Sequence, residues 1–134
     1  MNEPDLVLQA KDARGVVTLT LNRPQAFNAL SEGMLQALQA ALDRIAADGT
    51  ARAVVLKAAG KAFCAGHDLK EMRAEPSLDY YDRLFAQCAR MMLAIQKLPV
   101  PVIASVHGIA TAAGCQLVAM ARGSSPRMRA SKVA

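Results

Sequence analysis

Alternating apolar and polar residues predict strands in the first part of the chain. Segment 16–21 reads Val-Val-Thr-Leu-Thr-Leu and alternates with a period of two, as a half-buried strand does. The turn Arg14-Gly15 separates it from another apolar segment at 6–8. We therefore predict two neighbouring strands at the start of the fold.

Two longer segments have apolar residues at the spacing of an amphipathic helix. Ser31, a favoured N-cap residue, precedes the first helix, and Pro99 closes the second. The apolar positions are Met34, Leu35, Leu38, Leu42, Ile45 and Ala46 in the first helix, and Tyr81, Leu84, Cys88, Met91, Met92 and Ile95 in the second. A short apolar strand follows each helix, at 53–56 and at 102–106. This alternation predicts an α/β chain with right-handed crossovers.

Both of these later strands lead into loops rich in Gly and Ala, and each loop opens a helical segment. The first loop spans 62–70 and the second spans 108–117. Such loops place free backbone N–H groups at helix N-termini, where they can bind an anion or a polarised oxygen. On spacing alone, an ordinary turn capped by Asp68 is favoured for the first loop, and close helix packing is favoured for the second.

The composition suits one folded domain and argues against a nucleic-acid-binding surface. The chain has 134 residues, of which 53% are hydrophobic, and a formal net charge of +5. The last 13 residues hold four of the 16 Lys and Arg and no Asp or Glu, so the body is nearly neutral. Segment 98–121 carries no formal charge, but its prolines and glycines argue against a membrane span.

The cysteine pattern predicts neither a disulfide framework nor a metal site. Cys64, Cys88 and Cys115 are odd in number, and they form no C-x-x-C or Cys/His pair at metal-ligand spacing. The N-terminus is acidic and shows no apolar secretory segment. We therefore predict a reducing, cytoplasmic setting.

Three motifs between about residue 5 and residue 120 resemble the enoyl-CoA hydratase/isomerase (crotonase) family. They are Asn22-Arg23-Pro24-x-x-x-Asn28-Ala29-Leu30, Phe63-Cys64-Ala65-Gly66-x-Asp68-Leu69, and Pro101-Val102-Ile103-Ala104-x-Val106-x-Gly108 with Ala113-Gly114-Cys115. The resemblance implies a crotonase-like ββα spiral, a homotrimer or hexamer for the intact protein, and a role in fatty acid metabolism. It also implies an acyl-CoA thioester as ligand, with CoA as part of the substrate rather than a cofactor.

The resemblance further implies which residues contact the ligand. The backbone N–H groups of His67 and Ala113 would form an oxyanion hole for the thioester carbonyl oxygen. The CoA contacts implied by the same motifs are Gln25, Ala26, Phe27, Ala29, Ala65, Gly66, Asp68, Leu69, Lys70 and Gly114.

Two departures from the family pattern affect the expected activity. Gln116 stands where family hydratases have a catalytic glutamate, and an amide cannot exchange the proton that hydration requires. The second family glutamate lies beyond the end of the resemblance. We expect residues 1–121 to be the N-terminal half of a crotonase-like domain, and 122–134 to be a non-family tail, frameshifted or disordered. The chain alone is then expected to be inactive, and the alternative is a non-catalytic acyl-CoA-binding or subunit-interaction module.

Overall fold

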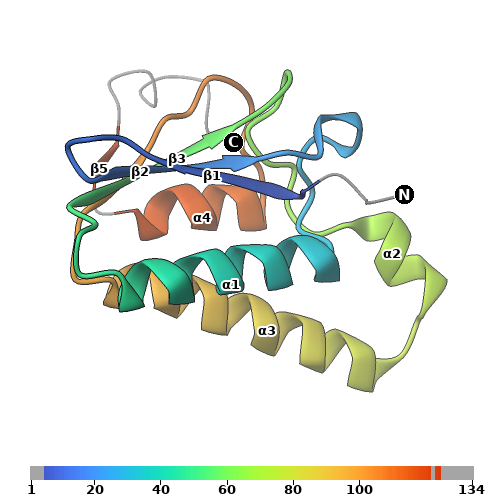
Figure 1. Ribbon diagram of the computed structural model, residues 1–134. Coiled ribbons are helices and arrows are strands. Elements are labelled where there is room, and N and C mark those ends of the chain that lie inside the picture. Colours follow the sequence, from blue (N-terminus) through green and yellow to red (C-terminus); the bar gives the residue numbers. More distant parts are fainter. Residues whose placement is uncertain (1–4, 122, 125–134) are drawn as a thin grey trace.

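The computed structural model describes residues 5–121 and 123–124, which form one sheet with helices packed against it (Figure 1). The elements in chain order are β1 (Val7–Lys11), β2 (Val16–Leu21), the 3-10 helix η1 (Pro24–Ala26), α1 (Glu32–Ala47), β3 (Ala53–Ala58), α2 (Leu69–Ala74), α3 (Leu78–Lys97), β4 (Val102–Ala104), α4 (Ala113–Met120) and β5 (Gly123–Ser124).

The sheet runs in the order β1-β2-β3-β4-β5 within the described residues. The pair β1 and β2 is an antiparallel hairpin, and each later pair is parallel. Helix α1 connects β2 to β3, α2 and α3 connect β3 to β4, and α4 connects β4 to β5. The predicted α/β architecture is therefore confirmed.

The core lies between the sheet and the long helices α1 and α3, which run side by side below it in Figure 1. Strand β2 buries Val17, Leu19 and Leu21, every second residue, as its alternation predicts. Helix α1 buries Met34, Leu35, Leu38, Ala41, Leu42 and Ile45, and α3 buries Tyr80, Leu84, Cys88, Met91, Met92 and Ile95. Of the apolar positions expected to face the core, Ala46 is exposed and Tyr81 is only partly buried.

Local hydrogen bonds fix the helix ends. The Ser31 side chain accepts a bond from Met34 N, so the predicted cap of α1 is confirmed, and Asp48 ends this helix. Helix α3 begins earlier than its apolar spacing suggests, because the Ser77 side chain accepts from Tyr80 N.

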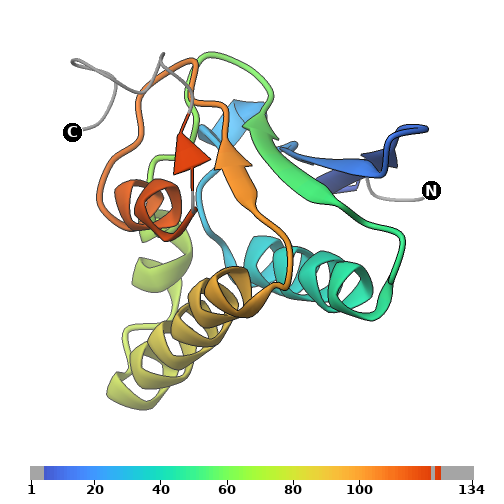
Figure 2. The same ribbon diagram turned by 90° about the vertical axis from the view of Figure 1, so that its left-hand side faces the viewer.

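Several boundaries differ from the sequence predictions. Strand β1 lies at 7–11 rather than 6–8, β3 continues to residue 58, and β4 ends at residue 104. The short element η1 was not expected, and α2 is the helical segment that the first loop was expected to open. Of the expected tail, Gly123–Ser124 pairs with β4, as seen beside it in Figure 2. Residues 122 and 125–134 of that tail lie outside the described part of the chain. Among the described helices, none is both long and apolar enough to cross a membrane.

Candidate functional site

The two glycine-rich loops lie side by side and continue the parallel pairing of β3 and β4. The N–H groups of Phe63 and Cys64 donate to Ile109 O at 2.9 and 3.2 Å. In return, Thr111 N donates to Cys64 O at 3.1 Å. The chain therefore brings together two loops that are far apart in the sequence.

Glycines allow this close approach of the two loop backbones. A Cβ on Gly108 would lie 2.1 Å from Lys61 O, and a Cβ on Gly114 would lie 2.3 Å from Cys64 O. Both distances are far below van der Waals contact, so no side chain fits at either position. The small residues of these loops thus hold the N-terminus of α4 against the backbone of the first loop.

The turns before His67 and Ala113 touch each other. Gly66 has φ +91°, and a Cβ there would lie 3.1 Å from Ala112 Cβ and 3.4 Å from Ala113 N. Ala112 has φ 49° and ψ −121°, a strained conformation for a residue with a side chain. Within the described residues, neither the His67 N–H nor the Ala113 N–H donates a hydrogen bond. Two unpaired donors therefore follow two turns that are in contact.

The segment that follows β2 packs against the first loop. Ala65 N donates to Phe27 O at 3.1 Å, and Leu30 N donates to Gly66 O at 2.7 Å. These bonds bring the expected CoA-contacting residues of the first motif beside those of the second. Phe27 is 55% exposed and Ala29 is buried.

Asn28 holds this segment in place through its buried side chain. Its amide Nδ2 donates to Ala59 O at 2.8 Å and to Ala62 O at 3.0 Å, while its Oδ1 accepts from Arg23 N at 2.8 Å. It also adopts the left-handed conformation, which asparagine tolerates better than most residues. Asn28 belongs to the first motif, but the sequence did not assign it a role.

Asp68 caps α2 and forms an ion pair with Arg23. Its Oδ1 accepts from Glu71 N at 3.1 Å, and its Oδ2 lies 2.7 Å from Arg23 Nη1. Burial opposes ionisation, but the bonds from Arg23 and Glu71 N outweigh it and hold the pKa of the Asp68 carboxyl below its usual value. The predicted capping role is therefore confirmed, and the ion pair ties the first loop to the segment after β2. The neighbouring side chains of Leu69 and Lys70 are exposed.

The His67 side chain packs edge-on against Phe85 of α3. The ring centroids lie 5.2 Å apart with an interplanar angle of 64°. The ring nitrogen Nδ1 is buried and has no hydrogen-bond partner. Burial lowers the pKa of the imidazole below its usual value, so the neutral form is favoured.

Gln116 lies in the first turn of α4, where its side chain is exposed. It lies three residues after Ala113, whose unpaired N–H is at the start of the same helix.

Within residues 5–121 and 123–124, no group of three His, Cys, Asp or Glu side chains could hold a metal ion. Cys64 and Cys88 are buried, Cys115 is half-buried, and all three thiols are free.

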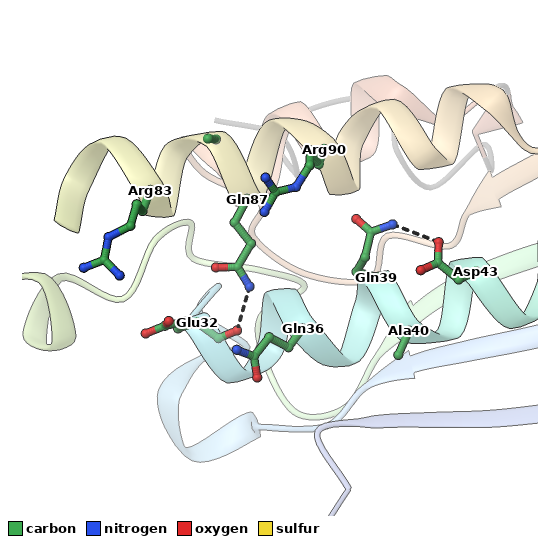
Figure 3. A pocket seen from close by; sticks show the side chains of 9 residues that line it. Glu32, Gln36, Gln39, Ala40, Asp43, Arg83, Gln87 and Arg90 are labelled. Atoms are coloured by element: carbon green, nitrogen blue, oxygen red, sulfur yellow. Dashed lines mark hydrogen bonds between the residues drawn. The ribbon is translucent and has the colours of Figure 1, made fainter. Parts of the chain in front are cut away.

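A groove lies elsewhere, between α1 and α3 (Figure 3). It has a volume of about 670 Å³, and Figure 3 shows Gln87 of α3 bonded to the Glu32 carbonyl of α1, with Arg83 and Arg90 on either side of Gln87. Its lining contains none of the loop residues described above. Most of its lining side chains are charged or amides. We locate the candidate site instead at the loops, where unpaired donors and strained backbone coincide.

Comparisons with known proteins show the family to which these loops belong. A family model described as enoyl-CoA hydratase/isomerase matches residues 11–122. The mitochondrial enoyl-CoA hydratase domain-containing protein 3 of Xenopus laevis is 48% identical over 116 residues, which are 87% of this chain and 39% of that protein.

Two solved structures resemble the fold described above. The enoyl-CoA hydratase of Mycobacterium smegmatis has a TM-score of 0.89 at 72% identity, over 91% of this chain and 47% of that one. The human enoyl-CoA hydratase domain-containing protein 3 has a TM-score of 0.83 at 37% identity, over 91% of this chain and 49% of that one. The chain thus spans less than half the length of these relatives.

Proposed function

This chain belongs to the enoyl-CoA hydratase/isomerase family and has its crotonase fold, and we propose that its two glycine-rich loops bind an acyl-CoA thioester. The thioester carbonyl oxygen is held between the backbone N–H groups of His67 and Ala113. In the intact protein, these donors stabilise the negative charge that develops on that oxygen when chemistry occurs at the neighbouring carbons.

One observation carries this proposal: the two N–H groups are unpaired and follow turns that touch at Gly66 and Ala112. A free backbone donor is costly unless water or a ligand satisfies it. The strain at Ala112 supports the same conclusion, because strained backbone persists where the surrounding structure enforces it, and such positions cluster at binding sites.

The CoA moiety lies along the segment after β2 and the first loop in this proposal. Gln25, Ala26, Phe27 and Ala29 contribute from the first segment. Ala65, Gly66, Asp68, Leu69 and Lys70 contribute from the loop and α2, and Gly114 contributes from α4. The exposed Lys70 ammonium can pair with a phosphate of the nucleotide, whereas Asp68 acts through its ion pair with Arg23.

Gln116 limits the reaction that we propose for these loops. Hydration of an enoyl thioester moves a proton from water to a carbon atom, and a glutamine amide is neither an acid nor a base near neutral pH. Asp68 is already engaged with Arg23 and Glu71 N. We therefore propose that this chain by itself does not turn over enoyl-CoA. The intact protein acts as a lyase or isomerase of fatty acid metabolism through groups outside this stretch.

The second candidate function is non-catalytic, either binding of acyl-CoA or contact with other family subunits. The residue that favours it is Gln116 in the first turn of α4, because the side chain of Gln116 is not titratable. A trimeric or hexameric assembly and a cytoplasmic location remain predictions. The Xenopus relative is named a mitochondrial protein.

The direct test compares two ligands that differ in one carbonyl oxygen. Butyryl-CoA carries that oxygen, and S-butyl-CoA, its thioether analogue, does not. Two hydrogen bonds to the oxygen predict about tenfold tighter binding of butyryl-CoA in isothermal titration calorimetry. Equal affinities would contradict the assignment of the two donors.

A second experiment separates the enzyme from the binding module. Gln116→Glu restores a titratable carboxyl at the start of α4. If the site is catalytic, this substitution in the intact protein raises hydration of crotonyl-CoA above that of the intact protein with Gln116. No gain, together with unchanged binding of butyryl-CoA, would favour the non-catalytic function.

A further inference from the structure

The imidazole of His67 is fixed beside the proposed carbonyl site. Its own backbone N–H is one of the two unpaired donors, so the side chain leaves the chain at the residue that binds the ligand. The edge contact with Phe85 of α3 holds the ring in one orientation. The ring is therefore held in one orientation next to the proposed carbonyl site.

The two ring nitrogens of His67 are in different environments. Nδ1 is enclosed by the protein and has no hydrogen-bond partner. Nε2 also lacks a hydrogen-bond partner within the described residues, but unlike Nδ1 it is not a buried atom. Nε2 is therefore the nitrogen that is open to solvent or to a ligand.

This difference decides where the ring proton resides. A proton on Nδ1 would create a buried N–H donor without an acceptor, and buried orphan donors are rarer than under-satisfied acceptors. Charging the ring would create the same buried donor and is opposed by burial. The neutral ring with its proton on Nε2 is the form that this environment favours, so His67 is a hydrogen-bond donor rather than a base.

The thioester carbonyl oxygen does not need this third donor. A carbonyl oxygen has two lone pairs, and the N–H groups of His67 and Ala113 use both of them. The Nε2–H group is left for another oxygen atom of the acyl part of the ligand.

We infer that His67 is a specificity-determining residue whose Nε2–H donates a hydrogen bond to an oxygen substituent on the acyl chain. The favoured ligands are then oxygenated acyl-CoA thioesters, such as 3-hydroxyacyl or 3-oxoacyl thioesters, rather than plain acyl-CoA. This inference rests on the proposed function, since it requires the thioester to lie at the two backbone donors.

Histidine-selective NMR tests the ring without any ligand. The chain has two histidines, His67 and His107, and the variant His67→Gln identifies which signals belong to His67. Long-range ¹H–¹⁵N correlation at pH 7 should show the neutral ring of His67 protonated on Nε2. A neutral ring protonated on Nδ1, or a charged ring, would overturn the inference.

Calorimetry tests the substrate class with three ligands, which are 3-hydroxybutyryl-CoA, butyryl-CoA and S-butyl-CoA. Wild type should bind 3-hydroxybutyryl-CoA about fivefold more tightly than butyryl-CoA, which corresponds to one neutral hydrogen bond. His67→Ala keeps the backbone N–H and should abolish that preference. His67→Gln places an amide N–H₂ group near the position of Nε2 and should retain part of it.

The outcomes separate this inference from the proposed function. If wild type prefers butyryl-CoA to S-butyl-CoA but binds the hydroxylated and plain ligands equally, the role of His67 is wrong and the carbonyl site stands. If the chain binds none of the three ligands, both proposals are wrong.

Discussion

Gly66 and Ala112 lie against each other at the turns that precede the two unpaired backbone donors. A Cβ on Gly66 would lie 3.1 Å from Ala112 Cβ, and the φ values of the two residues are +91° and 49°. Each turn therefore sets the position of the other. Changes at either residue should affect the ligand site as well as the stability of the chain.

Gly66→Ala should destabilise the fold and weaken acyl-CoA binding. Residue 66 must keep its left-handed backbone while carrying a side chain, and the new methyl group must displace the 111–113 backbone. Together these effects lower the free energy of unfolding by about 1–3 kcal/mol. Urea unfolding and calorimetry with butyryl-CoA measure the two effects. Gly49→Ala is the matched control, because a Cβ there meets nothing within 4 Å and its stability should hardly change. If both substitutions changed stability and binding equally, the contact between Gly66 and Ala112 would be contradicted.

Ala112→Gly should have opposite effects on stability and on binding. Glycine relieves backbone strain worth about 1–3 kcal/mol, and it costs about 0.5–1 kcal/mol in chain entropy, so the free energy of unfolding should stay equal or rise. Binding of butyryl-CoA should weaken, since the turn that orients Ala113 N–H becomes less restricted. In Ala40→Gly, an exposed position within α1, the same change should cost about 1 kcal/mol. A loss of that size at Ala112 would show that its backbone is not strained.

Asn28→Asp should be strongly destabilising although the two side chains have the same shape. The carboxylate loses both donors and faces the carbonyl oxygens of Ala59 and Ala62 without compensation, at a cost of at least about 3 kcal/mol. Thermal unfolding at pH 7 measures this loss. The same substitution at Asn22, whose amide makes an exposed bond to Asp5 O, should cost less than about 1 kcal/mol.

The ion pair between Arg23 and Asp68 should contribute to the acid sensitivity of the fold. Because the Asp68 pKa is lower in the folded chain than in the unfolded chain, its contribution is fully present above about pH 4. It is lost as the pH falls through the folded pKa. Asp48, whose pKa is lowered to about 2 by bonds from Thr50 and Lys11, adds to the same acid transition.

Asp68→Asn isolates the part that belongs to the ion pair. The variant should be less stable than wild type at pH 7, and the difference should shrink as the pH falls below about 4. Urea unfolding across this range gives both curves. The asparagine side chain of this variant can still accept the capping bond from Glu71 N, so a constant difference at every pH would contradict a contribution from the charge of Asp68.

The sequence predicts those features of the site that depend on neighbouring residues. Ser31 and Asp68 are caps because their side chains bond to backbone three residues away. The period-two pattern of β2 similarly predicts which of its side chains are buried. Helix α2 has six residues, which is too short for a clear helical period, so the sequence predicted its start at Asp68 but not its end.

Features that depend on distant segments could not be predicted in this way. Asn28 bonds to carbonyls 31 and 34 residues away, and residue type alone does not reveal these partners. The positive φ of Ala112 is likewise imposed by packing, since alanine by itself disfavours it. The contact of His67 with Phe85 joins a loop to α3. The helical spacing did not place Phe85 among the core positions, so this contact was not predicted.

The hydrogen bond from Thr111 N to Cys64 O has a consequence for how the chain folds. The two residues are 47 positions apart, and α2, α3 and β4 lie between them. The chain must close this long crossover before either donor turn is in place, so the binding site forms late on the folding pathway. Amide hydrogen exchange at Thr111 should therefore require nearly global opening. A bound thioester would slow that exchange by the same factor by which it stabilises the whole fold.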